Sequence, residues 1–148
     1  MIREATAIDI PVIIDFQQKM AWETEKVSLD PAILTRGVKN LFADVNLGKY
    51  YVAEENGTVV GCLMTTYEWS DWRNGTVLWI QSVYIIEPYR GKGIYKQLYN
   101  HIQEMVKKSS DLRGIRLYVD KTNKSAQHVY EKLGMNGEHY QVFEWMKP

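Results

Sequence analysis

Apolar positions along the chain first predict a buried strand and a helix that follows it closely. Residues 78–86 form an almost continuous apolar run, which indicates a buried strand. Ile94, Leu98, Ile102 and Met105 then recur at helical spacing. The short segment between these two elements, residues 90–96, therefore joins a strand to the N-terminus of a helix.

The chain before this pair has signals for a strand, two helices and a hairpin. Residues 2–5 predict a first strand, and Thr6 can cap the amphipathic helix that follows it. Asp30 and Pro31 have the residue types of an N-cap and a first helical position, so they predict the start of a second helix. The pair Asn56–Gly57 is typical of a type I′ turn and predicts a hairpin of residues 50–54 with 58–68.

The chain after the glycine-rich segment predicts three further elements. Residues 115–119 indicate a strand, 123–134 a helix and 140–146 a last strand. Asn123 is expected to cap the helix, and Gly134 is expected to end it. The complete predicted order is β-α-α-β-β-β-α-β-α-β.

The turn at residues 90–96 combines glycines with positive charge. Glycine lets a backbone curl so that several N–H groups point at one place. A helix N-terminus adds unpaired N–H groups and the positive end of its dipole, so the turn predicts an anion site, for which phosphate is the usual ligand. No window has the P-loop pattern, and Lys96 stands where the dinucleotide-binding pattern needs its last glycine.

A second pattern lies in the helix predicted over residues 123–134. Ala126, Val129, Tyr130 and Leu133 share one face, so by itself Tyr130 fits a core tyrosine on an amphipathic helix. However, the R-G-x-G turn resembles the pyrophosphate loop of the GNAT (Gcn5-related) N-acetyltransferases, and N-x-x-A-x-x-x-Y-x-x-x-G resembles a late helix of the same family. Both signatures stand in the family's order, and the resemblance covers essentially the whole chain.

The resemblance implies a fold and a reaction. The fold would be a single GNAT domain over residues 1–148, an α/β structure with a mixed sheet and helices on both faces. The reaction would be the transfer of an acetyl group from acetyl-CoA to a primary amine by direct attack in a ternary complex, with Tyr130 protonating the departing thiolate. The implied acetyl-CoA contacts are the strand residues Val83, Tyr84 and Ile85, the loop residues Arg90, Gly91, Lys92, Gly93, Ile94, Tyr95 and Lys96, and the later residues Asn123 and Ser125.

The chain departs from the family's pattern at two positions. The family usually has a small residue where Tyr95 stands, although only the backbone N–H is needed there. Many relatives have a glutamate on the central strand that deprotonates the amine through water, whereas the corresponding residue here is Gln81, which cannot accept a proton. Glu23, Glu68 and Asp71 are the alternative bases, and a water chain without a dedicated base is an equal alternative.

Aromatic and acidic residues gather in the segments that form the acceptor cleft of this fold. The expected acceptor contacts are Trp22, Glu23, Glu68, Trp69 and Gln81. Aromatic rings interleaved with carboxylates suit a small cationic amine, and residues 21–25 and 67–72 resemble the polyamine and diamine acetyltransferase branch. That branch has an acidic residue at the position of Gln81, and the pattern also fits rim tryptophans beside ordinary surface acids.

Composition and charge argue against several other classes of protein. The chain has 148 residues, of which 18 are basic and 18 acidic, so no basic field indicates a nucleic-acid partner. Cys62 is the single cysteine and the three histidines are scattered, so no metal is expected. We expect a cytoplasmic protein with no membrane partner, because the chain has neither a signal-peptide pattern nor a membrane-length apolar run. Phe143 and Trp145 alternate in the last predicted strand, which fits either a homodimer contact or one covered face of the sheet.

Two other functions remain open from the sequence. One is acetylation of a protein or peptide, which needs a shallow, open cleft. The other is an acyl-CoA-binding sensor without turnover, which the departures from the family's pattern at Gln81 and Tyr95 suggest. Tyr130 argues against the sensor, because a protein that only binds has less need of a hydroxyl group at the sulfur.

Overall fold

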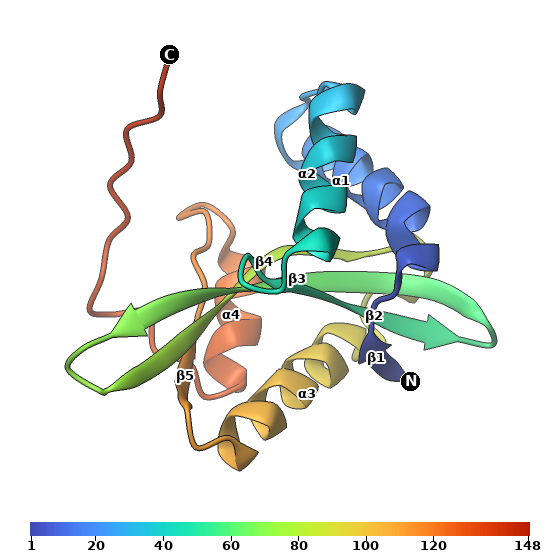
Figure 1. The fold of residues 1–148 in the computed structure, drawn as a ribbon. Helices are drawn as coiled ribbons and strands as arrows, with labels where there is room; N and C mark the ends of the chain where they lie inside the picture. Colours follow the sequence, from blue (N-terminus) through green and yellow to red (C-terminus); the bar gives the residue numbers. More distant parts are fainter. The chain divides into compact units, whose positions relative to one another are not determined.

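A five-stranded mixed sheet is the centre of the first part of the chain (Figure 1). The computed structural model describes residues 1–148, which divide into two compact units, Met1–Arg116 and Leu117–Pro148. The sheet lies in the first unit and has the strand order β1-β2-β3-β4-β5. The first four strands pair antiparallel, whereas β4 and β5 run parallel. The predicted mixed α/β fold is confirmed, and a single domain over the whole chain stays a prediction.

The elements follow one another in the predicted order as far as the last helix. The strands are β1 (Ile2–Glu4), β2 (Lys49–Glu55), β3 (Thr58–Ser70), β4 (Gly75–Ile85) and β5 (Leu112–Arg116). The helices are α1 (Ile10–Glu25), α2 (Pro31–Ala43), α3 (Ile94–Lys108) and α4 (Lys124–Lys132), with short 3-10 turns at Ala7–Asp9 and Glu87–Tyr89. Within the first unit, α1 and α2 cover one face of the sheet and α3 covers the other (Figure 1). None of the helices has the length and apolar character needed to cross a membrane.

Local signals in the sequence place the boundaries of several elements. Asp30 Oδ1 accepts the backbone N–H groups of Ala32 and Ile33 at 2.9 and 3.3 Å, which confirms the predicted start of α2. Asn56 and Gly57 have φ values of 50° and 77°, so the β2–β3 hairpin closes through the left-handed turn that their sequence predicts.

Two apolar layers hold the sheet between the helices. Ile13 and Phe16 of α1 are buried against Cys62 and Tyr84, and the rings of Phe16 and Tyr84 lie 5.2 Å apart. On the other face, the ring of Tyr51 lies 5.6 Å from His101 of α3. The face that carries Cys62 and Tyr84 is therefore the α1/α2 face of the sheet.

The second unit contains α4, and its caps follow the sequence. Asn123 Oδ1 accepts the N–H of Ala126 at 3.0 Å, and Gly134 has a φ of 88° just after the helix. Gln127 donates to the carbonyl oxygens of Asp120 and Lys121 at 3.3 and 3.0 Å. These bonds tie the segment before α4 to the helix itself, and both predicted caps are confirmed.

Two predicted strands differ in the structure. β5 begins at Leu112 rather than at residue 115, because its pairing with β4 starts at the Thr76–Leu112 pair, ahead of the apolar run. The strand predicted over residues 140–146 is wrong, since this segment forms no strand. Alternating apolar residues indicate faces that could be buried, but a strand also needs a hydrogen-bonded partner, which the pattern does not supply.

Asp9→Asn is expected to lower the free energy of unfolding by about 2 kcal/mol at pH 7, because hydrogen bonds to charged groups contribute about 1.5–3 kcal/mol. The Asp9 carboxylate is buried and accepts from both terminal nitrogens of Arg3, at 2.8 and 3.0 Å, and from the Thr6 N–H at 2.7 Å. The Arg3 hydrogen bond lowers the pKa of Asp9 below its usual value. The stabilisation is therefore fully present at pH values above the usual pKa, and it is lost as pH falls through the lowered pKa of Asp9 in the folded protein.

Denaturant unfolding at pH 7 and pH 3 would measure this loss. The matched control is Asp15→Asn, which removes an exposed carboxylate paired with Lys19 at 2.7 Å and should change stability by less than about 0.5 kcal/mol. Equal effects of the two substitutions would contradict the assigned role of Asp9.

Candidate active site

The central strand β4 has an extra residue at its centre. Gln81 pairs with Met64 and Tyr84 pairs with Cys62, so two residues of β4 lie opposite one residue of β3. Ser82 has a φ of 53° at this point, which is the left-handed region that a non-glycine residue seldom adopts. A β-bulge therefore turns the backbone of β4 directly before Val83.

The bulge lies where β4 has only one neighbouring strand. The parallel ladder between β4 and β5 ends at the pair Trp79–Arg116, whereas pairing with β3 continues to Ile85. The edge of β4 that carries Val83, Tyr84 and Ile85 therefore has no strand of the sheet beside it. An extended molecule with amide groups can pair with such an edge in the way that an added strand does.

Buried polar groups hold the bulge from the α1/α2 face. The Cys62 thiol donates to the carbonyl oxygen of Ser82 at 3.6 Å, and Gln17 of α1 donates to Cys62 Sγ at 3.8 Å. Burial raises the pKa of the Cys62 thiol to about 12, so it stays protonated and remains a donor at neutral pH. The bulge is thus connected to the first helix through two side chains.

The loop between β4 and α3 has the backbone conformation of an open anion cradle. Gly91 and Gly93 have φ values of 74° and 81°, and a Cβ at either position would meet no atom within 4 Å. Gly93 is the N-cap of α3 and makes no side-chain cap bond, so the first N–H groups of the helix are left without a side-chain cap. The residues present therefore fit a phosphate group, with Lys92 and Lys96 supplying positive charge.

Arg90, at the start of this loop, is directed toward α1. Its Nε donates to the carbonyl oxygen of Ile85 at 2.8 Å, and its Nη2 donates to both carboxylate oxygens of Glu23 at 3.1 Å. The guanidinium also lies 5.3 Å from the ring centre of Tyr84. A hydrogen bond from the Tyr84 hydroxyl and the contacts of Arg90 lower the pKa of Glu23. The cluster of Glu23, Tyr84 and Arg90 thus joins the end of α1 to the end of β4.

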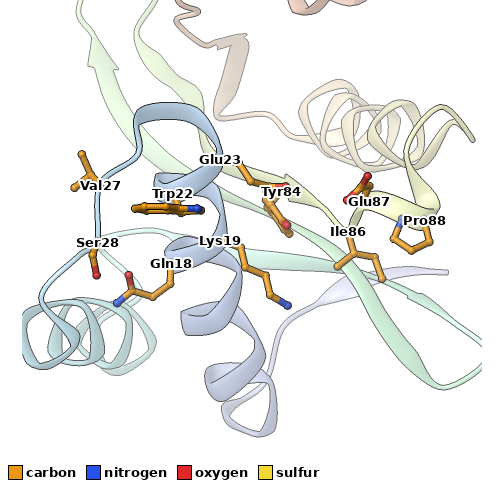
Figure 2. A pocket seen from close by; sticks show the side chains of 10 residues that line it. All are labelled: Gln18, Lys19, Trp22, Glu23, Val27, Ser28, Tyr84, Ile86, Glu87 and Pro88. Atoms are coloured by element: carbon orange, nitrogen blue, oxygen red, sulfur yellow. The ribbon is translucent and has the colours of Figure 1, made fainter.

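A pocket of about 830 Å³ opens beside this cluster (Figure 2). One wall is the C-terminal half of α1, and the other is the end of β4 with the short turn that follows it (Figure 2). Its lining combines apolar surface with the carboxylates of Glu23 and Glu87 and the ammonium of Lys19. The full lining is Gln18, Lys19, Trp22, Glu23, Val27, Ser28, Tyr84, Ile86, Glu87 and Pro88.

Polar side chains continue along the α1/α2 face of the sheet beyond the bulge. Gln81 Nε2 donates to Thr66 Oγ1 at 2.6 Å. Glu68 accepts from Trp79 Nε1 at 2.8 Å and from Arg116 Nη1 at 2.5 Å. Residues along a strand alternate between its two faces, so Trp69 lies on the opposite face from Glu68.

The structure therefore brings some of the expected acceptor residues together and separates others. Trp22 and Glu23 line one pocket, and Gln81 and Glu68 lie in one polar row on the α1/α2 face. Trp69 belongs to neither group and is largely exposed.

Of the three carboxylates that could replace a glutamate at position 81, Glu68 and Glu23 are poorly suited to accept a proton, and Asp71 lies in the turn between β3 and β4. Hydrogen bonds from Trp79 and Arg116 lower the pKa of Glu68, as those from Tyr84 and Arg90 lower the pKa of Glu23. A base is most effective when its pKa lies near the working pH, so both shifts run in the wrong direction.

Glu68→Gln is accordingly expected to lower kcat/KM by less than about tenfold, which is below the 10²–10⁴-fold contribution of a general base. The measurement is the pH profile of kcat/KM for the wild type and the variant. Glu104→Gln is the matched control, because Glu104 is an exposed partner of Lys107 at 3.3 Å on α3. A drop of 100-fold or more, with loss of an acidic inflection in the profile, would identify Glu68 as the base after all.

Three expected site residues lie in the second unit. Tyr130 is half-buried on α4, and burial raises the pKa of its phenol. Asn123 caps the helix, and Ser125 is exposed in its first turn. A phenol with a raised pKa stays protonated at neutral pH, so Tyr130 is available as a proton donor.

Sequence reasoning missed several features of the first unit. It did not find the bulge, although a polar Ser82 inside an apolar run is a weak signal for one. It assigned Arg90 to the phosphate alone, because the contact with Glu23 joins residues 67 positions apart. It also missed most of the pocket lining, such as Lys19 and Pro88, which comes from segments with no motif.

Comparisons with known proteins identify the family to which the chain belongs. Residues 15–135 match the model of the "Acetyltransferase (GNAT) family". A solved structure described as a possible acetyltransferase from Clostridium difficile 630 is 45% identical, with a TM-score of 0.93 over 100% of this chain and 97% of that chain. A transcriptional regulator from Bacillus halodurans C-125 is 25% identical, with a TM-score of 0.84 over 99% of both chains.

A further solved structure shows the fold at lower identity. It is a predicted acetyltransferase with acetyl-CoA from Clostridium acetobutylicum, 21% identical, with a TM-score of 0.76 over 97% of this chain and 95% of that chain. No curated protein matches the chain by sequence. The chain belongs to the GNAT acetyltransferase family and is an acetyl-CoA-dependent acetyltransferase.

Proposed function

We propose that the protein transfers the acetyl group of acetyl-CoA to the primary amine of a small cationic acceptor, and that this acceptor binds in the pocket between α1 and the end of β4. The observation that carries the proposal is the place of this pocket in the first unit. It lies beside both the open edge of β4 and the glycine-rich loop, and it is lined by Trp22, Glu23 and Tyr84. The resemblance of residues 21–25 and 67–72 to polyamine acetyltransferases supports a cationic amine as the class of acceptor.

The chemistry of the lining favours an amine over an anion. Glu23 is paired with Arg90 and Lys19 with Asp15, so the carboxylate of Glu87 is the charge in the lining that no ion pair balances. Trp22 is more than half exposed, and the ammonium group of Lys26 lies 5.6 Å from its ring centre, a cation–π contact of the kind that an alkylammonium acceptor could also make. The guanidinium of Arg90 forms a salt bridge with Glu23 and is not directed as a free cation into the pocket.

Acetyl-CoA would bind along the first unit's open edge and loop. The amides of pantetheine would pair with the backbone at Val83, Tyr84 and Ile85, and the pyrophosphate would lie at Gly91, Gly93 and the N-terminus of α3. Lys92, Ile94, Tyr95 and Lys96 complete the loop, and Asn123 and Ser125 are the proposed contacts from the second unit. The bent backbone at Ser82 would place an N–H group of β4 near the acetyl oxygen, where negative charge develops.

The reaction would proceed by direct attack. The neutral amine nitrogen forms a bond with the thioester carbon, the carbonyl oxygen becomes an oxyanion, and the carbon–sulfur bond breaks as the amide forms. The thiolate takes a proton from Tyr130, which regains one from water, and the amine's extra proton leaves to solvent. Deprotonating an amine of pKa about 10.4 at pH 7 costs about 4–5 kcal/mol.

In this proposal the acceptor amine gives its proton to solvent rather than to a carboxylate. Gln81 donates a hydrogen bond to Thr66 and cannot accept a proton from the amine. Glu23 and Glu68 both have lowered pKa values. The expected consequence is a kcat/KM that rises steadily with pH until the acceptor amine itself loses its proton.

The test is thiol release from acetyl-CoA with a panel of diamines, polyamines, amino acids, aminoglycosides and peptides. The wild type should turn over at least one small cationic amine, and Glu23→Gln should raise the KM for that amine with little change in acetyl-CoA affinity. Glu25→Gln, at the exposed end of the same helix, is the matched control and should leave the KM unchanged. Turnover of peptides alone would identify a protein acceptor. Acetyl-CoA binding with no turnover by any amine would favour the sensor.

A further inference from the structure

We propose that Gln17 and Cys62 are positioning residues for acetyl transfer, which hold the β-bulge of β4 in the conformation that directs its backbone at the acetyl group. The inference rests on the proposed place of the acetyl oxygen beside the bent backbone at Ser82, and it does not depend on the identity of the acceptor. It starts from two hydrogen-bonding side chains that are buried between α1 and the sheet.

Gln17 differs from the other buried residues of α1. Those residues are Ile13, Phe16 and Ala21, whereas Gln17 carries an amide and is only 5% exposed. Burying an amide costs free energy unless the amide is hydrogen-bonded, so an apolar residue would serve the packing of the core better. The Gln17 amide donates to Cys62 Sγ at 3.8 Å, which points to the sulfur as the group that this buried amide serves.

Cys62 makes the contact with the bulge itself. Ser82 and Val83 of β4 lie opposite a single residue of β3, so the regular ladder is interrupted at this point. The Cys62 thiol donates to the Ser82 carbonyl oxygen at 3.6 Å and so supplies a hydrogen bond where the ladder is interrupted. Hydrogen bonds from the Tyr84 backbone and the Gln17 amide lower the pKa of the thiol less than burial raises it. The sulfur therefore contacts the backbone on both sides of Val83.

The bulge needs this support because its backbone conformation is strained. Ser82 has a φ of 53°, and a residue with a side chain is disfavoured in this left-handed region. A strained conformation persists only where the surrounding structure fixes it more strongly than the strain opposes it. The thiol fixes the Ser82 carbonyl, and Gln17 fixes the thiol, so the loss of either side chain lets the backbone rotate. The N–H groups that follow Ser82 would then turn away from the acetyl oxygen.

The same two side chains also relate the bulge to the acceptor pocket. Gln17 is followed on α1 by Gln18, Lys19 and Trp22, which belong to one wall of that pocket (Figure 2). The hydrogen bond from Gln17 to the sulfur is directional, whereas apolar packing is not, so it fixes this wall against β4. The amine nitrogen and the acetyl carbon must lie about 3–3.5 Å apart and aligned for attack, so the alignment of α1 with the bulge contributes to the rate.

Infrared spectroscopy of bound acetyl-CoA tests the proposal without any acceptor. The probe is acetyl-CoA with a ¹³C-labelled acetyl carbonyl, whose stretching frequency falls as a backbone N–H group polarises it. Cys62→Ala and Gln17→Leu should each move this band to a higher frequency than in the wild type. Cys62→Ser places a hydroxyl donor on the same Cβ and should return the band toward its wild-type position. A band that stays at the wild-type frequency in both Cys62→Ala and Gln17→Leu would overturn the proposal.

Turnover then separates positioning from stability. Cys62→Ala and Gln17→Leu are each expected to lower kcat about 10–100-fold with the best amine of the panel, because a small misplacement of the reacting groups can cost about 100-fold. The KM for acetyl-CoA should change less than about twofold, since the loop before α3 holds the pyrophosphate. The matched control is Val38→Ala, which truncates a buried residue of α2 and should leave the infrared band and kcat unchanged. An equal loss of kcat in Val38→Ala would contradict the proposal.

These results are distinct from a failure of the proposed function. If no amine of the panel is acetylated, the proposed acceptor class is wrong, but the infrared comparison still decides the role of Gln17 and Cys62. Because Cys62 is the single cysteine, the S–H stretching band of the wild type belongs to it alone. This band should show a hydrogen-bonded thiol and should shift when acetyl-CoA binds, so it decides even if Cys62→Ala fails to fold. A band at the frequency of a free thiol that acetyl-CoA does not move would overturn the proposal.

Discussion

Tyr130→Phe is expected to lower kcat by about 100-fold while it changes acetyl-CoA affinity by less than about twofold. Positioned acid catalysis contributes about 10²–10⁴-fold. The expected loss is at the low end because a free thiol has a pKa near 8.5, below the ordinary value of about 10 for a phenol. Burial raises the pKa of Tyr130 further, so transfer of its proton to the thiolate is uphill. The phenol therefore stabilises the departing sulfur first by donating a hydrogen bond as negative charge develops, and the uphill transfer of its proton is completed as it regains a proton from water.

The substitution separates a catalytic role of Tyr130 from a structural one. Phenylalanine keeps the ring that packs on α4, so the melting temperature should change little and calorimetry should show normal acetyl-CoA binding. Tyr118→Phe removes a hydroxyl from an exposed tyrosine of the same unit and should keep wild-type turnover. An equal loss of kcat in both variants, or a loss of acetyl-CoA binding in Tyr130→Phe, would contradict a role at the sulfur.

Local sequence signals predicted local structure well in this chain. Asp30, Asn56–Gly57 and Asn123 each fix a few neighbouring backbone groups, so their residue types were enough to place a helix start, a hairpin turn and a second helix start. The glycine-rich loop belongs to the same class, because its conformation depends on which residues can adopt a positive φ.

Features that depend on distant partners could not be predicted in this way. The contact between Arg90 and Glu23 requires knowledge of where α1 ends in space, and the pairing of Glu68 with Arg116 requires the register of three strands. Trp69 is a different case, because neighbours along a strand point to opposite faces, so Trp69 could have been separated from Glu68 from the sequence alone. The strand predicted over residues 140–146 had the composition of a strand, but the segment forms none.

Gly93→Ala is expected to weaken acetyl-CoA binding by about 10–100-fold. Gly93 has a φ of 81°, and an L-residue in the left-handed region costs about 1–2 kcal/mol. A Cβ at this position would touch nothing within 4 Å, so the cost is backbone strain rather than a clash. The loop can relieve that strain by rotating toward negative φ, which turns its N–H groups away from the phosphate. Losing one or two charge-assisted hydrogen bonds, at about 1.5–3 kcal/mol each, accounts for the expected change in affinity.

Gly57→Ala provides a control with the same backbone cost at a different place. Gly57 has a φ of 77° in the β2–β3 turn, and a Cβ there also meets no atom within 4 Å. Denaturant unfolding should show a loss of about 1–2 kcal/mol of stability for Gly57→Ala and no larger loss for Gly93→Ala, whereas calorimetry should show weakened acetyl-CoA binding only for Gly93→Ala. Because the two sites share strain and open space but differ in position, a selective loss of affinity measures what the loop's backbone contributes to holding the phosphate. Equal affinities in the two variants would mean that the lysines around the loop, rather than the direction of its N–H groups, bind the pyrophosphate.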